Sequence, residues 1–312
     1  MIVEPKLQTK LYGHSKVLND LIKLYNHQFL PSKILLSGPK GIGKSTLSYH
    51  LINYVFSKNE KNSYKLEFNE INEENKSFKL LNSFTHPNFY LIDLEDGNKS
   101  IEISQVRQMI NYTNKSSFND TPRFILIDNI EKLNINSTNA LLKIIEEPNK
   151  DIYFILVHNS NKRISQTLKS RCLTFKLNLK FNKTLEVVDT ILSQKTLELI
   201  NLDLINYYNT VGDYINLFNF SNKNNINLKD TNLKSFLSLL IEGNHYKKNN
   251  FVKENIFSYI ELYFLKVFYK NQNRNELMEI YTQFIQNINN AKNFNLDLES
   301  LFMEFKSKIL NG

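Results

Sequence analysis

The glycine-rich segment after residue 37 constrains the fold of this chain more than any other feature. It follows the apolar run Lys33–Ser37 (KILLS), precedes a helical pattern that begins at Lys44, and matches G-x-x-x-x-G-K-[ST] in full. A strand that enters this motif and a helix that leaves it are the context in which such a loop binds phosphate. The residues of the loop are Gly38, Pro39, Lys40, Gly41, Ile42, Gly43, Lys44, Ser45 and Thr46.

The chemistry of this loop predicts a nucleotide ligand. Glycines let backbone N–H groups turn inward toward phosphate oxygens, and the N-terminus of the following helix adds partial positive charge. We expect Lys44 to reach the β- and γ-phosphates and the Ser45 hydroxyl to bind Mg²⁺. ATP with Mg²⁺ is therefore the predicted cofactor. The alternative is a loop that keeps this shape as a folding element, without bound nucleotide.

Short apolar runs alternate with helical patterns over the first half of the chain. The runs end in polar or turn residues and are Lys33–Ser37, Phe89–Asp93, Arg123–Asp128, Ile152–Val157 and Leu173–Leu177. Helical periodicity lies between them, in Lys16–Tyr25, Lys44–Phe56, Ser104–Thr113 and Thr138–Glu147. Apolar strands that alternate with helices are typical of a parallel sheet covered on both faces. We predict an α/β domain with a parallel five-stranded sheet over residues 1–178.

Strand signals end near residue 178, and the remainder has a helical pattern. Residues 179–222 indicate a small helical unit, and the polar stretch Ser221–Asn225 indicates a linker. Apolar residues then recur at helical spacing, in Leu233, Phe236, Leu237 and Leu240 and again in Ile256, Tyr259, Ile260, Tyr263 and Phe264. This pattern predicts an all-α domain over residues 223–312.

Composition narrows the class of protein. Cys172 is the one cysteine, so neither an intramolecular disulfide nor a cysteine-rich zinc site is expected. A net charge of +8 favours polyanionic partners such as DNA, but the general abundance of Asn, Ile and Lys along the chain is its main explanation, so the charge supports DNA binding only mildly. The first residues lack the apolar core of a signal peptide, and no apolar run reaches the roughly 18 residues that span a bilayer. We therefore expect a cytoplasmic protein without a membrane partner.

An acidic residue ends the run Arg123–Asp128. Asp128 would help to hold Mg²⁺, as in a Walker B motif, although many strands end in an Asp that only caps a turn. The next residue is Asn129, whose amide can hydrogen-bond water but cannot take its proton. Glu131 is expected to point away from the site. The sequence therefore favours nucleotide binding over hydrolysis.

A second set of residues carries a family resemblance. The segment Thr138–Pro148 contains N-A-L-L-K-x-x-E-E-P, and Ser170-Arg171-Cys172 precedes the run Leu173–Leu177. Together with the phosphate-binding loop, their order resembles the clamp-loader branch of AAA+ proteins. Finer matches are similar to the delta-prime group of bacterial clamp-loader subunits: Leu11–His14 (LYGH), Thr85–Tyr90 (THPNFY), Ile103–Arg107 (ISQVR) and Asn295–Asp297 (NLD).

The resemblance implies three domains and several roles. The domains are a RecA-like AAA+ nucleotide domain, a helical lid and a collar that joins five subunits into a ring. Asn159 falls where the family has its sensor 1 residue, and Arg171 falls on the arginine that reaches a neighbouring subunit's ATP site. The implied partners are gamma/tau-type and delta subunits, the sliding clamp and primer-template DNA. Cys172 is expected to be a small buried apolar residue.

Two departures from the family pattern also matter. The interval Asn59–Lys79 reads as a polar insertion without the cysteines of a zinc module, so no zinc is expected. Where a lid arginine would approach the triphosphate, the best-placed residue is Asp213, whose carboxylate would repel phosphate. We therefore predict a delta-prime-like subunit with weak hydrolysis of its own. The alternatives are a gamma/tau-type motor subunit and another AAA+ factor of DNA repair.

Overall fold

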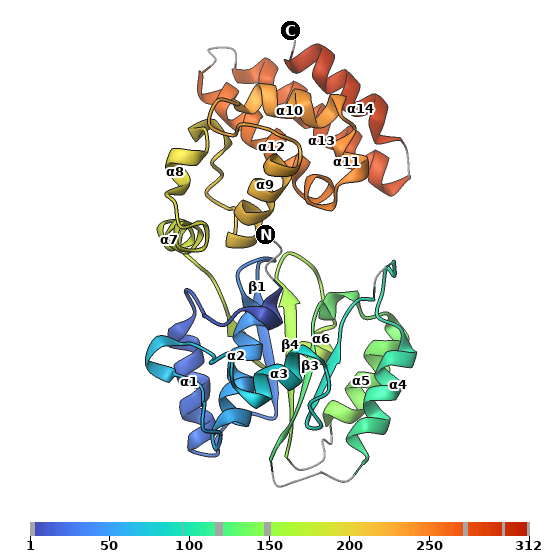
Figure 1. Ribbon diagram of the computed structural model, residues 1–312. Coiled ribbons are helices and arrows are strands. Elements are labelled where there is room, and N and C mark those ends of the chain that lie inside the picture. The colour runs from blue at the N-terminus through green and yellow to red at the C-terminus, as the bar shows by residue number, and fades with distance from the viewer. Residues whose placement is uncertain are drawn as a thin grey trace. The chain divides into compact units, whose positions relative to one another are not determined.

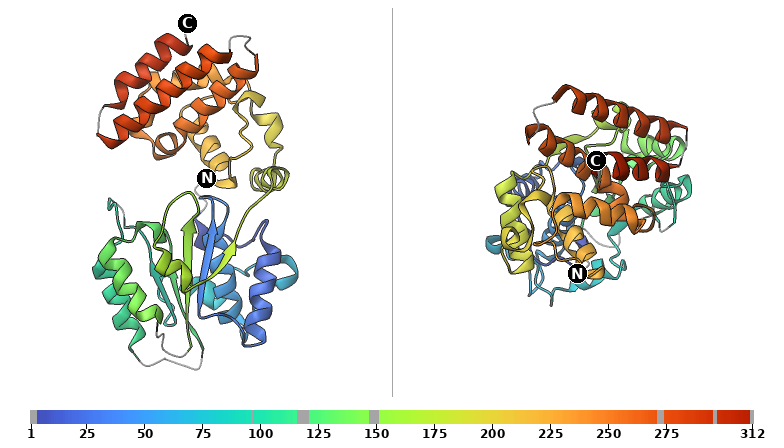
Figure 2. Two further views of the ribbon diagram at one scale, coloured as in Figure 1. Left: turned by 180° about the vertical axis from the view of Figure 1, so that it is seen from behind. Right: turned by 90° about the horizontal axis from the view of Figure 1, so that it is seen from above.

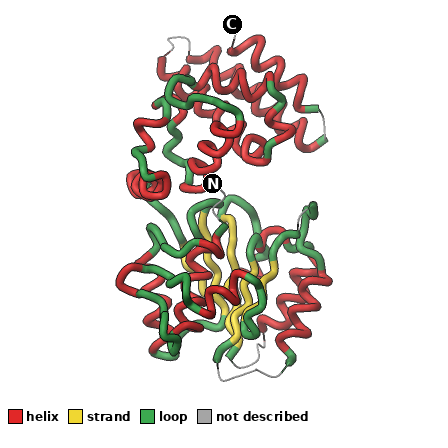
Figure 3. The backbone as a smooth tube through the Cα atoms, viewed as in Figure 1, coloured by secondary structure: helices red, strands yellow, loops and turns green. Residues whose placement is uncertain are grey.

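A computed structural model describes residues 4–95, 97–115, 121–146, 151–270, 274–294 and 297–310. The chain divides into two compact units, the first formed by Met1–Val187 and Thr210–Gly212 and the second by Val188–Asn209 and Asp213–Gly312. Among the described residues, all strands lie in the first unit, and the second unit is helical (Figure 3).

The first unit is built on one parallel sheet. Its strands are β1 (Lys33–Gly38), β2 (Phe89–Ile92), β3 (Arg123–Ile127), β4 (Ile152–Asn159) and β5 (Leu173–Lys176). They lie in the order β2-β3-β4-β1-β5, and every pair is parallel (Figure 1). The register sets Gly38 opposite Asn159, so the loop after β1 and the end of β4 meet at the carboxyl edge of the sheet. Ligands of open parallel sheets bind at this edge.

Helices cover both faces of this sheet. One face packs on α1 (Ser15–Asn26), α2 (Lys44–Ser57) and α3 (Lys76–Asn82), and the other on α4 (Ile103–Thr113), α5 (Ile135–Glu146) and α6 (Gln166–Ser170). Seen from behind, blue helices lie on one side of the sheet and green helices on the other (Figure 2). Successive residues of β3 alternate between the two cores, Phe124 and Leu126 in one and Ile125 and Ile127 in the other. The predicted α/β fold class with five parallel strands is confirmed.

The predicted polar insertion forms ordered structure. Residues 59–79 include the 3₁₀ turn η2 (Leu66–Phe68) and the start of α3, and Lys65 and Glu70 form a short bridge. Tyr64, Ile71 and Phe78 are buried in the core beside α2. Three apolar anchors therefore fix a segment whose composition is otherwise polar.

The second unit is a helical bundle. Its elements are the end of α7 (Phe181–Leu192), α8 (Thr196–Leu199), η4 (Leu202–Leu204), α9 (Val211–Lys223, from Asp213), α10 (Leu233–Glu242), α11 (His245–Lys248), α12 (Asn250–Lys270), α13 (Arg274–Asn293), α14 (Leu298–Phe305) and η5 (Lys306–Leu310). The apolar residues expected at helical spacing line its core, except that Tyr263 is half-buried. Across the described parts of both units, no helix is long and apolar enough to cross a membrane.

The predicted linker at Ser221–Asn225 is wrong over its first three residues. Helix α9 continues to Lys223, and Ser221 is buried. The Ser221 hydroxyl donates to the carbonyl of Phe218 within the helix, at 2.9 Å, so this polar residue is satisfied inside the last turns of α9. The division of the chain at residues 178 and 222 stays a prediction.

Candidate nucleotide-binding site

The glycine-rich loop joins β1 to α2 as the motif predicts. Gly43 precedes α2 with φ of +91°, and Gly41 has φ of +84°, a left-handed conformation that favours glycine. Helix α2 starts at Lys44, so its unpaired N–H groups and partial positive charge face the loop. This geometry suits an anion at the loop.

The side chain of Lys44 folds back over the loop and hydrogen-bonds to its backbone. Its Nζ donates to the carbonyl oxygens of Gly38, at 2.9 Å, and Pro39, at 2.6 Å, and only 6% of the residue is exposed. Burial lowers the pKa of Lys44 to about 8, although the charges of Asp128 and Glu131 oppose this effect. A buried ammonium with partly lost hydration is suited to an anionic ligand, which would restore its electrostatic partner.

Ser45 and Asp128 meet as the sequence predicts. The Ser45 hydroxyl donates to Oδ2 of Asp128 at 2.5 Å, and the Asp128 N–H pairs with the carbonyl of Ile92 on β2. Burial raises the pKa of Asp128 to about 6, and the nearby Asp93 carboxylate adds to the rise. A hydroxyl and a carboxylate are oxygen ligands of the kind that Mg²⁺ prefers. The residues at the loop thus fit a magnesium–triphosphate group.

Asn129 is fixed by two hydrogen bonds. It has a left-handed backbone with φ of +52°, and its N–H donates to Oδ1 of Asp128 at 2.8 Å. Its side-chain amide donates to Oδ1 of Asp93 at 2.7 Å. Asp93 follows β2, and the sequence did not single it out.

Glu131 lies in the site, so the expectation that it points away is wrong. The left-handed turn at Asn129 starts the 3₁₀ turn η3 (Ile130–Lys132), which directs the Glu131 carboxylate back toward β4. Its Oε2 accepts the backbone N–H of Asn159 at 3.1 Å. Asn159 also accepts at Oδ1 from the N–H of Asn161, at 3.2 Å. Its role as sensor 1 stays a prediction.

His14 supports the loop from the opening segment Leu11–His14. The ring is 3% exposed, and in the tautomer with a proton on Nε2 it donates to the carbonyl of Ile42 at 2.6 Å. Burial lowers the pKa of His14, with a further effect of the Lys44 charge, which favours the neutral ring. The contact of His14 is thus with the loop backbone.

Gly212 makes a second contact with the loop, which the sequence did not reveal. Its N–H donates to the carbonyl of Gly41 at 2.9 Å, and a Cβ built on Gly212 would lie 2.7 Å from Cα of Gly41. Residues Thr210–Gly212 belong to the first compact unit for this reason. Asp213 begins the part of α9 in the second unit, where its charge acts on Tyr214 and Tyr259.

Arg171 lies apart from these residues, just after α6. Its side chain is 36% exposed; one terminal nitrogen contacts a Glu146 carboxylate oxygen at 2.7 Å, and the other donates to the carbonyl of Thr167 at 2.9 Å. Cys172 is half-buried rather than fully buried, and burial raises the pKa of its thiol to about 11. Glu147 and Pro148 of the N-A-L-L-K-x-x-E-E-P segment, and Asn295 and Leu296, lie outside the described residues.

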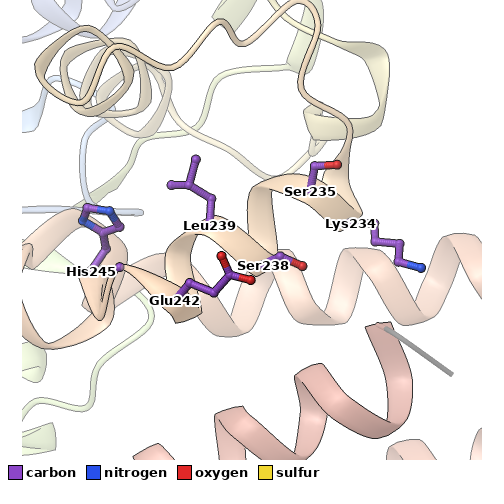
Figure 4. A pocket seen from close by; sticks show the side chains of 7 residues that line it. Lys234, Ser235, Ser238, Leu239, Glu242 and His245 are labelled. Carbon is purple, nitrogen blue, oxygen red and sulfur yellow. The ribbon is translucent and has the colours of Figure 1, made fainter.

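A separate hollow of about 460 Å³ lies along α10 in the second unit. Figure 4 shows side chains of α10 and the start of α11 around it. It is lined by Lys234, Ser235, Ser238, Leu239, Glu242, Gly243 and His245, none of which belongs to the motifs described above.

More than half of the chain matches a known protein family. Residues 13–180 match the sequence profile of a family described as DNA polymerase III, delta subunit. A DNA polymerase III subunit delta' of Pseudomonas aeruginosa is 31% identical over 139 residues, which are 45% of this chain and 40% of that protein. A DNA polymerase III subunit gamma of Buchnera aphidicola is 32% identical over 228 residues, 68% of this chain and 59% of that protein. The chain thus spans less than two thirds of either relative.

Among solved structures, a DNA polymerase III gamma subunit-related protein from Thermotoga maritima is similar. The two share 13% identity with a TM-score of 0.42, over 91% of this chain and 96% of that one.

Proposed function

The chain belongs to the family described as DNA polymerase III, delta subunit, and from this membership we propose that it is a delta-prime-type subunit of a replicative clamp loader. In that role it joins gamma/tau-type and delta subunits in a five-membered ring that places the sliding clamp on primer-template DNA in the cytoplasm. The observation that carries the proposal is the coexistence of a nucleotide site lacking a carboxylate directly after Asp128 with an exposed arginine after α6.

The chain's own loop binds ATP with Mg²⁺. The bound nucleotide supplies a triphosphate whose negative charge the protein must neutralise. Lys44 provides the positive charge, and the N–H groups at the start of α2 add hydrogen-bond donors. Ser45 and Asp128 hold the metal. Asn159, at the end of β4 opposite Gly38, orients groups at the γ-phosphate.

Arg171 serves the neighbouring subunit. A guanidinium donates to two phosphate oxygens at once, and an arginine supplied in trans can raise phosphoryl transfer by about 10³ to 10⁵. Arg171 is partly exposed, and it contacts Glu146 and Thr167, which lie outside the chain's own loop. The subunit then acts as a fixed part of the ring that completes its neighbour's site.

Hydrolysis at the chain's own site is slow. The residue after Asp128 is an amide, which orients water but takes no proton. A second candidate function, a gamma-type motor, is favoured by the similarity to the Buchnera gamma subunit and by the Glu131 carboxylate near Asn159. The two functions predict different sensitivities to substitution in this chain.

The test is the ATPase rate of the reconstituted clamp loader, stimulated by clamp and primed DNA, with one substitution in this subunit only. We expect Arg171→Ala to lower the rate at least about tenfold and Lys44→Ala to change it less than about twofold. Lys169→Ala, an exposed cation of α6, is the matched control for loss of charge. A motor is indicated instead if Lys44→Ala abolishes most turnover and Arg171→Ala has no effect.

A further inference from the structure

The amide of Asn129 and the carboxylate of Asp93 form a pair across two neighbouring strands. Strands β2 and β3 are in register, with Ile92 opposite Ile127, so Asp93 and Asp128 leave the sheet side by side. The Asn129 amide then donates to Oδ1 of Asp93 at 2.7 Å. Asp93, directly after β2, thus fixes Asn129, which directly follows the magnesium-binding Asp128 at the end of β3.

Asp93 is itself held in place. Its Oδ1 accepts the N–H of Leu94 at 2.6 Å, and its carbonyl accepts the Gln105 side-chain amide of α4 at 2.9 Å. The backbone of Asn129 is fixed equally, through its bond to Oδ1 of Asp128. The bond to Asp93 uses one of the two N–H donors of the Asn129 amide, so its second N–H and its Oδ1 are left to face a ligand or water, and neither can take a proton from water.

We propose that Asp93 is the positioning residue of Asn129 and that this carboxylate–amide pair keeps the chain's own nucleotide site from activating water. The inference rests on the proposed function, because it concerns ATP bound at the same loop. The carboxylate needed for hydrolysis is present in the pair, but it lies on the β2 side. The amide occupies the position directly after Asp128.

The pair would prevent hydrolysis because the attacking water must give up a proton and the pair places no base where it could receive one. In hydrolysis, a water oxygen bonds to the γ-phosphorus, the bond from that phosphorus to the bridging oxygen of ADP breaks, and a proton of the water passes to a base. A carboxylate directly after Asp128 would accept this proton, whereas the amide of Asn129 does not. With Asp93 retained, however, a second carboxylate would face the first within hydrogen-bond distance, and like charges at this separation repel.

The experiment is therefore a reciprocal exchange. The full chain is prepared as wild type, Asp93→Asn, Asn129→Glu and the double variant Asp93→Asn/Asn129→Glu, and ATP hydrolysis is measured under single-turnover conditions. We expect Asn129→Glu alone to hydrolyse ATP at least about fivefold more slowly than the double variant. The double variant restores the amide–carboxylate bond in the opposite sense, and we expect it to hydrolyse ATP at least about tenfold faster than wild type, toward the 10²- to 10⁴-fold range of general-base catalysis.

Thermal unfolding without nucleotide provides a second readout that does not depend on activity. Asn129→Glu should lower Tm by about 4 °C or more when Asp93 is present. In the Asp93→Asn background the same substitution should lower Tm by clearly less, because a hydrogen bond replaces the repulsion and only the strain of a glutamate at the left-handed φ of position 129 remains. Asp230→Asn is the control for loss of one carboxylate, since Asp230 accepts from Asn227 in an exposed amide–carboxylate pair of the second unit, away from the nucleotide site.

The outcomes separate the inference from the proposed function. Affinity for a fluorescent ATP analogue with Mg²⁺ is measured for all variants. If ATP binds but Asn129→Glu alone gains as much hydrolysis as the double variant, or the double variant gains none, the inference is overturned. Additive changes in Tm would equally contradict the pairing of Asp93 with position 129. If no variant, wild type included, binds the analogue, the proposed nucleotide site fails, while non-additive Tm values would still support Asp93 as the positioning residue.

Discussion

Gly212 is a residue whose small size has a direct structural reason. Its N–H donates to Gly41 of the phosphate-binding loop, and a Cβ at position 212 would lie 2.7 Å from Cα of Gly41 and 3.2 Å from its carbonyl oxygen. We expect Gly212→Ala to push the loop backbone and to cost about 1 to 3 kcal/mol of stability, as overpacking does. Gly212→Ala should also weaken ATP binding, which the control substitution Gly97→Ala should not do. Urea unfolding and titration with a fluorescent ATP analogue measure both effects.

Gly97→Ala is the control for this residue. Gly97 has φ of +84° and no atom near its Cβ position, so alanine there adds backbone strain without a collision. Its cost should be about 1 kcal/mol, with ATP affinity unchanged. Equal ATP affinity in the Gly212→Ala variant and the wild type would show that the contact does not support the loop.

Helix α3 shows how an acidic side chain organises a whole element. Glu60, beyond the end of α2, accepts the backbone N–H groups of Lys76 and Ser77 at the start of α3, at 2.8 and 3.0 Å, and the Ser77 hydroxyl. These N–H groups have no partner within the helix, and a carboxylate near a helix N-terminus is favourable. We expect Glu60→Ala to lower the free energy of unfolding by about 1.5 to 3 kcal/mol. Urea unfolding measures the loss.

Limited proteolysis gives an independent test at the level of the element. Cleavage between residues 59 and 82 should accelerate in Glu60→Ala and stay unchanged in Glu73→Ala, which removes an exposed carboxylate of the same segment. Similar cleavage rates in the two variants would mean that Glu60 does not hold α3.

The elements differ in how far the sequence predicts them. Five apolar runs each became a strand. The central strands β1, β3 and β4 are largely buried on both faces and are therefore apolar almost throughout, whereas the edge strand β5 is partly exposed. The segment 59–79 escaped prediction because its anchors, Tyr64, Ile71 and Phe78, are spaced without a strand or helix period. Ser221–Lys223 was assigned to a linker because polar residues satisfied inside a last helical turn resemble a loop in sequence.

The residues of the site also fall into two groups, those that the sequence predicts and those that it does not. Gly38–Thr46 and Asp128 were predicted because the motif is contiguous and follows a strand. Asp93, Glu131 and Gly212 were not, since their placement depends on strand register, a left-handed turn and a contact over long sequence separation. Local motifs reveal residues that act through neighbours in sequence; residues brought together only by the tertiary fold need the structure.

At the scale of the whole chain, we expect buried histidines to make the first unit more sensitive to acid than the second. The first unit contains His14 and His50, at 3% and 0% exposure, and the half-buried His86, which stacks on Phe56. Burial lowers the pKa of all three, to about 4 for His50 and His86. A histidine whose folded pKa lies below its ordinary 6.5 stabilises the fold above that value, and this contribution is lost as pH falls toward 4. Asp128, with its raised pKa of about 6, partly offsets the loss.

We therefore expect the first unit to lose on the order of 2 to 4 kcal/mol of stability between pH 6.5 and 4, since each pKa unit corresponds to about 1.4 kcal/mol. Hydrogen exchange followed by mass spectrometry at pH 7 and pH 4.5 measures the two units separately in one chain, after correction for the intrinsic pH dependence of exchange. Protection should fall in residues 4–187 and change less in the second unit.

His50→Gln identifies the source of this pH dependence. The ring of His50 contacts the Tyr64 hydroxyl at 2.8 Å and the Gln8 carbonyl at 3.0 Å, and glutamine retains a polar group there without a proton to gain in this pH range. The variant should be less stable at pH 7 but should lose markedly less protection on acidification than wild type, because one of the three histidines no longer titrates. If its loss between pH 7 and 4.5 equals that of wild type, or if the second unit loses protection first, burial of neutral histidine does not govern the acid response of this chain.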